Sequence, residues 1–286
     1  MSSLHPDAAL PAWRKRSPRH ELLVFCGWLL ALCAVYLAFQ VMTRDTIWVF
    51  VTDAPRQVAD VGSRMLPPDW AYIGELAWPL WETLNIATLG TLLGTALAVP
   101  VAFLAAANTT PSARLLRPLA LLVIVSSRSI NSLIWALLLV AILGPGVLAG
   151  ILAIALRSIG FIGKLLYEAI EEIDGSQVEA IAATGATRAQ VMSWGVVPQV
   201  APTLAGISVF RWDINIREST VLGLVGAGGI GVKLEAALGT LAWPKVTLLL
   251  LVILATVAVS EWTTARVRRH PVSYTHLRAH ETRGNI

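Results

Sequence analysis

Ionisable side chains inside apolar segments are the first residues of this chain that could do chemistry. A charge at the centre of a bilayer costs roughly 2.5–3.5 kcal/mol on insertion scales, so such groups should face protein or water rather than lipid. Arginines outnumber carboxylates among them, and this surplus of positive charge suits an anion. The residues concerned are Arg128, Arg157, Arg211, Asp213, Arg217 and Glu218.

Arg128 belongs to a polar pattern within a long apolar segment. Arg128, Asn131, Ser132 and Trp135 are spaced i, i+3, i+4 and i+7, which on one continuous helix puts them on a single face. We expect this face to line either a solute pathway or a contact between two copies of the chain. Packing within a helix interface is the alternative.

A second polar group lies further along the chain, in the segment 199–222. Asp213 and Arg217 are four residues apart and are expected to pair on one helix face. Arg211, Asn215 and Glu218 are interspersed with them and are further candidates for lining a pathway. Mutual neutralisation inside a helix interface would explain the same charges without any pathway.

Four glycines follow this segment: Gly226, Gly228, Gly229 and Gly231. Three of them fit the pattern G-x-G-x-x-G, but a dinucleotide site also needs a βαβ unit and an acidic residue about 20 positions later. The residues there, 248–251, are all apolar. The glycines instead predict a tight turn at the outer end of the segment, which serves either close packing or a gate.

Motifs for common enzymatic chemistry are absent. The chain has no Walker A pattern, H-E-x-x-H or G-x-S-x-G, so we expect no catalytic residue and no ATP motor within it. Cys26 and Cys33 lie in one apolar segment without disulfide or zinc spacing, and no metal or cofactor is expected. A membrane enzyme using Arg128, or Asp213 with Glu218, remains the alternative of a different class.

Composition indicates the element type that positions these groups. The 286 residues are 56% hydrophobic and only 14% charged, with a mean hydropathy of +0.67. A bilayer is therefore the expected solvent, and the net charge of +4 lies in flanking segments rather than in a nucleic-acid-binding patch. We predict an all-α, polytopic helical bundle with spans at about 22–42, 81–107, 115–143, 146–167, 199–222 and 244–264.

The first span, 22–42, carries no small-residue cleavage site and is expected to stay uncleaved. The 115–143 segment is long and has a polar hump, so it could be broken or tilted. Residues 43–80 contain several prolines and predict a periplasmic loop, which could contain a short helix.

The positive-inside rule predicts the orientation. With both termini in the cytoplasm, the inner flanks hold eleven basic residues and the outer loops five, which favours this orientation. The inner ones lie in the N-terminal segment 1–21, at Arg114, Arg117, Lys164 and Arg188, and in the tail 266–286, from Arg266 to Arg269. From about residue 272 the tail is polar and aperiodic, and we interpret it as foreign to the natural chain. His276 and His280 are i, i+4 in that tail and are not expected to bind metal.

The loop 168–198 is too charged to be a span and carries helix start signals. Ser176-x-x-Glu179 and Thr187-x-x-Gln190 both fit a capping box. Gly185 lies between them, where a chain leaving a helix often needs a positive φ, and Pro198 lies where the next span begins. A helix–turn–helix on the cytoplasmic face is predicted.

The stretch EAIAATGATRAQVMSWGVVP resembles the EAA loop of bacterial ABC importer permeases. Glu179, Ala180, Gly185 and Pro198 match the family pattern in register, and Arg188 lies within the same loop. The departures are apolar: Ile181 for Ala, Gly195 for Ile and Val197 for Leu. The resemblance implies helices that dock into a cleft of a separate ATPase subunit. An ordinary amphipathic connector is the alternative.

Two further blocks, RSINSLIWALLLVAILGPGVLAGILAIALRSIGFIGKLLYEAIEEID and FRWDINIRESTVLGLVGAGGIG, resemble phosphonate-importer permeases, and with the loop between them they cover about 128–231. The resemblance implies a type I importer permease domain over about 81–265 in a bacterial inner membrane. It also implies a homodimer, two ATPase copies and a periplasmic phosphonate-binding protein. Phosphite, phosphate or another small solute remain alternatives to phosphonate.

Overall fold

The computed structural model describes the backbone of residues 18–281 and the side chains of residues 19–267. Every regular element in that part of the chain is helical. The chain divides into two compact units, residues 1–60 and 61–286. The expectation that residues from 272 are foreign lies outside the described side chains, as do His276 and His280.

The first unit contains α1 (Pro18–Thr43). Its large apolar side chains are exposed on all sides, from Leu22 to Met42, as in a helix surrounded by lipid. The second helix, α2 (Trp48–Met65), crosses the boundary between the units and is amphipathic. The predicted loop at 43–80, in which a short helix was possible, therefore contains a helix of 18 residues.

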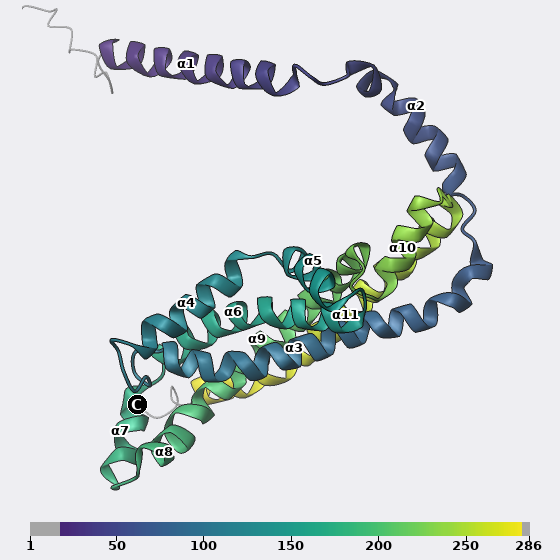
Figure 1. The fold of residues 1–286 in the computed structure, drawn as a ribbon. Helices are drawn as coiled ribbons and strands as arrows, with labels where there is room; N and C mark the ends of the chain where they lie inside the picture. The colour runs from purple at the N-terminus through teal and green to yellow at the C-terminus, as the bar shows by residue number, and fades with distance from the viewer. Residues whose placement is uncertain (1–17, 282–286) are drawn as a thin grey trace, which may run out of the picture. The chain divides into compact units, whose positions relative to one another are not determined.

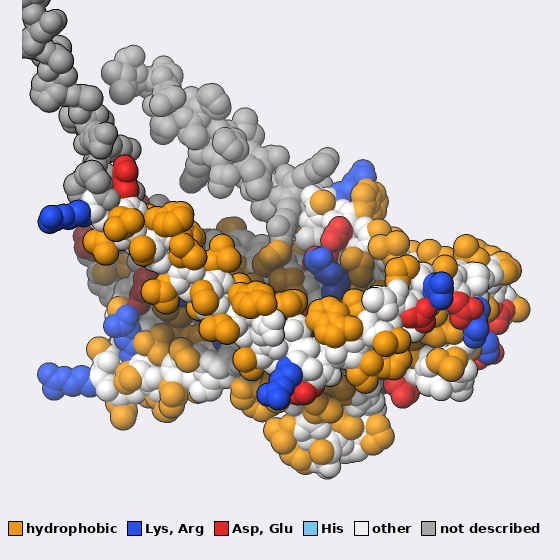
Figure 2. Space-filling view, turned by 90° about the horizontal axis from the view of Figure 1, so that it is seen from above, with side chains coloured by type: hydrophobic (Ala, Val, Ile, Leu, Met, Phe, Trp, Pro, Cys, Tyr) orange, Lys and Arg blue, Asp and Glu red, His pale blue; other side chains and the backbone are white. Residues whose placement is uncertain are grey.

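The second unit is a helical bundle (Figure 1). Its long helices are α3 (Ala77–Ala105), α6 (Val147–Glu171), α9 (Val197–Leu222) and α11 (Trp243–Glu281). α3, α6 and α9 pack against one another, and α11 packs against α9. Hydrophobic side chains are spread over much of the described surface in Figure 2, as expected for a surface solvated by lipid. The shorter elements are η1 (Trp70–Leu76), α4 (Leu116–Ser129), α5 (Ser132–Leu143), α7 (Gly175–Ala183), α8 (Arg188–Val191), the π-helical turn η2 (Met192–Val196), η3 (Gly223–Val225) and α10 (Ile230–Gly239).

Small residues bring α3 and α6 together. A Cβ placed on Gly90 would lie 2.6 Å from Ile154 Cγ2, and one placed on Gly94 would lie 2.6 Å from Ser158 Cβ. Close backbone approach through small residues four apart is typical of helix pairs in membranes, where apolar burial supplies little driving force. This contact places Ser158, at the middle of α6, against α3.

Within the part of the chain that the structure describes, four helical stretches are long and apolar enough to cross a membrane: Arg19–Thr43, Trp70–Ala105, Val147–Glu171 and Trp243–Val267. Two bent pairs pass the same test, α4 with α5 and the stretch Arg188–Val225 with α10. Counting each pair as one span gives six, as predicted. The polar hump in 115–143 corresponds to a real break, with α4 and α5 meeting at 90°.

This break overturns the prediction that Arg128, Asn131, Ser132 and Trp135 share one helix face. Arg128 lies in the last turn of α4, whereas Asn131 is the N-cap of α5 and accepts a hydrogen bond from Leu133 N at 3.0 Å. Asparagine favours this capping position, where its side chain satisfies a backbone N–H that has no helical partner. Trp135 packs into a core cluster with α6 instead.

Candidate functional site

A buried polar network joins α3, α6 and α9 at mid-span. Ser158 Oγ accepts hydrogen bonds from Arg211 Nε and from Asn215 Nδ2, both at 3.1 Å. Asn215 Nδ2 also donates to Thr91 Oγ1 at 2.7 Å, and its Oδ1 has no partner. Arg211 and Asn215 are almost fully buried. Their hydrogen bonds offset the cost of desolvating polar groups here.

Arg211 also belongs to an ionic triad with Glu218 and Arg157. Its Nη1 and Nη2 atoms lie 3.5 and 3.2 Å from the two carboxylate oxygens of Glu218, a forked arrangement. Arg157 Nε approaches Glu218 Oε1 at 3.4 Å. The Arg211 guanidinium also lies 5.2 Å from the centroid of the Phe161 ring. The triad carries one net positive charge.

Sequence reasoning did not anticipate that Glu218 pairs with Arg211. The two residues are seven apart on α9, a spacing that returns to the same helix face after two turns. That spacing was a usable signal. The hydrogen bond from Arg211 to Ser158 on α6 had no comparable signal, because it depends on how two helices pack.

The expected pairing of Asp213 with Arg217 is present. Asp213 Oδ1 also accepts a hydrogen bond from Ser260 Oγ at 2.8 Å, and Arg217 Nη1 lies 3.2 Å from Glu261 Oε1. These partners belong to α11, so this second cluster fastens α9 to α11. Glu261 is a carboxylate that the predicted set of charges in the spans did not include.

Arg128 is exposed on α4 and borders a cavity of about 400 Å³ with Val125 and Ser129. Its side-chain stem lies against α6, where a Cβ on Gly160 would come within 2.8 Å of Arg128 Cγ. Among the side chains that the structure describes, Arg128 has no carboxylate within salt-bridge distance. Asn131, predicted beside it on one face, instead caps α5 beyond the bend.

The predicted turn after α9 is present, and the glycines make it possible. Gly226, Gly228 and Gly229 have φ values of 83°, 83° and 77°, a region that other residues rarely adopt. Gly231 is helical and packs so closely on Gly223 that a Cβ would lie 2.8 Å from the Gly223 Cα. Whether this turn opens as a gate stays a prediction.

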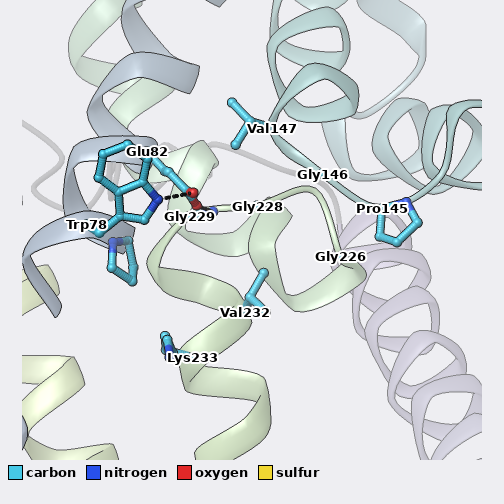
Figure 3. Close-up of a pocket in the computed structure, with 11 residues that line it drawn as sticks. Trp78, Glu82, Pro145, Gly146, Val147, Gly226, Gly228, Gly229, Val232 and Lys233 are labelled. Atoms are coloured by element: carbon cyan, nitrogen blue, oxygen red, sulfur yellow. Dashed lines mark hydrogen bonds between the residues drawn. The ribbon is translucent and has the colours of Figure 1, made fainter. Parts of the chain in front are cut away.

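A residue missed in the sequence holds this turn in place. Glu82 of α3 accepts hydrogen bonds from Trp78 Nε1 at 2.7 Å and from Gly229 N at 3.1 Å (Figure 3). Beside it, Thr83 Oγ1 accepts from Ile230 N at 2.8 Å. The carboxylate thus lies at the N-terminus of α10, where negative charge is favourable. We call these contacts of Glu82 and Thr83 the glycine-turn latch.

The latch borders an open cavity of about 380 Å³. On its other side Gly146 N donates to Gly226 O at 2.9 Å, so the turn is held between α3 and the α5–α6 connection. Figure 3 shows these residues around the cavity, which is lined by Trp78, Pro79, Glu82, Pro145, Gly146, Val147, Gly226, Gly228, Gly229, Val232 and Lys233.

The loop between α6 and α9 forms the predicted helix–turn–helix, at the opposite end of the bundle from α10 (Figure 1). The first start signal was assigned wrongly: Asp174, not Ser176, caps α7, and its Oδ1 accepts from Ser176 N at 2.9 Å. The Ser176 hydroxyl and then its backbone N–H lower the pKa of Asp174, because both donate to the ionised carboxylate. Glu179 and Ala180 are exposed on α7.

The second half of the loop follows the prediction. Thr187 and Gln190 form the capping box at the start of α8, and Gly185 has a φ of 80°. Arg188 donates to Thr109 O at 3.1 Å and to Thr110 O at 3.3 Å, which ties α8 to the α3–α4 connection. Pro198 lies in the first turn of α9, where proline is tolerated.

Two departures from the EAA pattern compensate each other in volume. A Cβ on Gly195 would lie 3.4 Å from Ile181 Cδ1 and 3.5 Å from Val178 Cα. Ile181 is larger than the family's Ala, whereas Gly195 is smaller than its Ile. The two changes therefore keep α7 packed against the turn that precedes α9. No cluster of metal-ligating side chains is present in the described part of the chain.

Comparison with known proteins finds relatives that are permeases of ABC importers. The chain matches the family described as binding-protein-dependent transport system inner membrane component over residues 98–270. It is 38% identical to the phosphite transport system permease protein PtxC of Stutzerimonas stutzeri, over 94% of this chain and 99% of that protein. It is 42% identical to the phosphate-import permease protein PhnE of Mycolicibacterium smegmatis, over 79% of this chain and 42% of that protein.

The fold has counterparts among solved structures. The inward-facing MetNI methionine ABC transporter aligns with a TM-score of 0.61 and 22% identity, over 71% of this chain and 99% of that chain. This likeness shows a shared fold. Permeases of this family work with a separate ATPase subunit and a substrate-binding protein. The chain belongs to the family of binding-protein-dependent inner membrane transport components, and is a multi-pass ABC importer permease rather than a membrane enzyme.

Proposed function

We propose that this permease imports a phosphorus oxyanion: phosphonate, phosphite or phosphate. The observation that carries the proposal is the relative at 38% identity over nearly the whole of both chains, whose name assigns it to phosphite transport. The net positive triad of Arg157, Arg211 and Glu218 supports it, because an oxyanion crossing the bilayer needs a compensating cation along its route. A periplasmic phosphonate-binding protein is the expected donor.

The helix–turn–helix is proposed as the element that docks into the ATPase. α7 and α8 project from one end of the bundle, and they are fastened to the spans through Arg188 and the core around Met192. A push on α7 is therefore transmitted to α9 rather than absorbed by a loose loop. Glu179 and Ala180 supply the exposed surface, Gly185 the sharp turn, and Pro198 the junction with the span.

We propose that two copies assemble around one pathway, with both termini in the cytoplasm. Under this orientation the glycine turn and its latch lie at the outer end of the spans, and α7 and α8 lie at the inner end. Arg128, Asn131, Arg211, Asp213, Asn215, Arg217 and Glu218 are the proposed lining or supporting residues. Alternating access then couples opening of one end to closure of the other.

The experiment is ATP hydrolysis by the permease reconstituted with its ATPase and binding protein. Phosphonate, phosphite, phosphate and no ligand are compared. Stimulation by one of these oxyanions supports the proposal and identifies the solute. An assembled complex that none of them stimulates contradicts it.

The docking element is tested in the same assay. Gly185→Trp strains the turn, and Glu179→Lys reverses the charge on the exposed face of α7, so both should abolish stimulation while membrane insertion stays normal. Glu172→Lys is the matched control, because it reverses an exposed carboxylate just outside the motif. Normal stimulation of either loop variant would show that the ATPase docks elsewhere.

A further inference from the structure

We propose that a track of oxyanion-binding positions runs along α6, formed by Arg157 and Lys164 of α6 with Arg128 of α4 between them. On this view the carboxylate of Glu218 occupies the position that the transported anion would otherwise take beside the arginines. The inference rests on the proposed function, because it names the residues that hold the same oxyanion in transit. It assigns different roles to the two arginines of the triad.

Arg211 is the fixed member of the triad. Its guanidinium is held by Ser158 at Nε, by the Glu218 carboxylate at both Nη atoms and by the Phe161 ring, and its side chain is 2% exposed. A forked pair of N–H groups facing two oxygens is the geometry in which arginine binds carboxylate or phosphate. Glu218 therefore occupies a position already shaped for an oxyanion.

Arg157 is the exchangeable member. It reaches Glu218 through one contact, at 3.4 Å, and its side chain is 29% exposed. A charged group within a span does not face lipid at low cost, so this exposed part should face water or a second chain. An arriving oxyanion can contact Arg157 from that side without displacing Arg211 from its partners.

Two more cations continue the line toward the cytoplasmic end of α6. Lys164 lies seven residues after Arg157, about 10 Å further along the helix at 1.5 Å per residue. Arg128 crosses α6 between them at Gly160, where the missing side chain leaves room for the arginine stem. The cavity beside Arg128 has a volume of about 400 Å³, which is larger than the roughly 30 Å³ that one water molecule occupies in the liquid.

The resident carboxylates explain how such a track would release its cargo. Glu218 is paired with Arg157, and Glu168 is paired with Lys164. A pathway must bind an ion strongly enough to admit it and weakly enough to let it leave. A carboxylate beside the cation competes with the oxyanion and keeps each position weak, so that the anion moves on.

The experiment measures binding of radiolabelled inorganic phosphate to the permease–ATPase complex in nanodiscs, without nucleotide or binding protein. Arg157→Gln and Arg128→Gln should each weaken phosphate binding about tenfold, because each removes a charge-assisted hydrogen bond. Glu218→Gln should strengthen it about tenfold by removing the competing anion. Lys245→Gln, a cation that stacks on Tyr72 away from the track, should leave binding unchanged.

If these residues had a purely structural role, every substitution would weaken phosphate binding or leave it unchanged. Tighter phosphate binding by Glu218→Gln therefore distinguishes the track from a structural role. If that variant does not assemble because Arg211 loses its partner, the two arginine variants decide the question. Phosphate binding equal to the original protein in both would overturn the track. Stimulation of ATP hydrolysis by the loaded binding protein is measured separately. If an oxyanion stimulates hydrolysis but the arginine variants bind phosphate normally, only the track is refuted. If no oxyanion stimulates hydrolysis, the proposed function is refuted.

Discussion

Replacing Glu82 by Gln should loosen the outer end of the permease by a measurable amount. Glu82 accepts hydrogen bonds from Trp78 Nε1 and from Gly229 N, and its charge lies at the start of α10. Hydrogen bonds to charged groups contribute about 1.5–3 kcal/mol, against about 0.5–1.5 for neutral ones. The helix dipole adds roughly 0.3–1 kcal/mol.

A glutamine keeps one acceptor oxygen but loses the charge. The net loss of latch stability is therefore about 1.5–3 kcal/mol, which raises the population of an open glycine turn by roughly ten- to a hundredfold. Amide hydrogen exchange of residues 226–232, followed by mass spectrometry in nanodiscs, reports this opening directly. Exchange should accelerate by that factor in Glu82→Gln.

Glu75→Gln is the matched control, because Glu75 is an exposed carboxylate on the neighbouring η1. Its substitution should leave exchange in residues 226–232 unchanged. Equal exchange rates in Glu82→Gln and in the original protein would refute the reasoning, since they would show that Thr83 and the packing of the turn hold it without the carboxylate.

Three further predictions concern the loop and the packing. Thr187→Ala removes the capping box of α8 and should destabilise the helix–turn–helix by about 1 kcal/mol. The loss is measured as faster amide hydrogen exchange in residues 187–191. Thr184→Ala, beyond the end of α7, should have a smaller effect on the same amides. The pKa of Asp174 is lowered in the folded chain, so the ionised cap stabilises α7 fully when the pH is above the unfolded-state pKa of about 3.9. This stabilisation is lost as the pH falls through the lower pKa of the folded state, so pepsin cleavage within 175–183 should rise below about pH 4. Asp174→Asn should lack this pH dependence. Gly231→Ala should destabilise the protein by about 1–3 kcal/mol in a detergent melt, because its methyl group would clash with Thr220 O and would lie 2.8 Å from Gly223 Cα. Gly239→Ala has open space around it and should leave the melt nearly unchanged.

Features with a local cause were predictable from the sequence. Hydropathy located the spans, because a helix in lipid must be apolar over its whole length. The capping box at Thr187 and the turn at Gly226 depend on residues within a few positions of each other, and both are present. The polar hump near Asn131 predicted a possible break, although not its angle of 90°.

Features that depend on packing between distant segments were not predictable. The latch joins Glu82 to Gly229, which is 147 residues away, and the bond from Arg211 to Ser158 spans 53. The cap of α7 failed for a different reason. Asp174 and Ser176 are both good capping residues two positions apart, and the helix began at the earlier one because α6 ends at Glu171 and leaves room for it.

The π-helical turn Met192–Val196 connects the docking element to α9. A turn of this kind holds one residue more than an α-helical turn, so it represents a single-residue insertion in an otherwise continuous helix. Deleting one residue there would restore the regular winding and rotate α7 and α8 by about 100° around the axis of α9. The direction in which the permease presents α7 and α8 thus depends on the winding of this one turn.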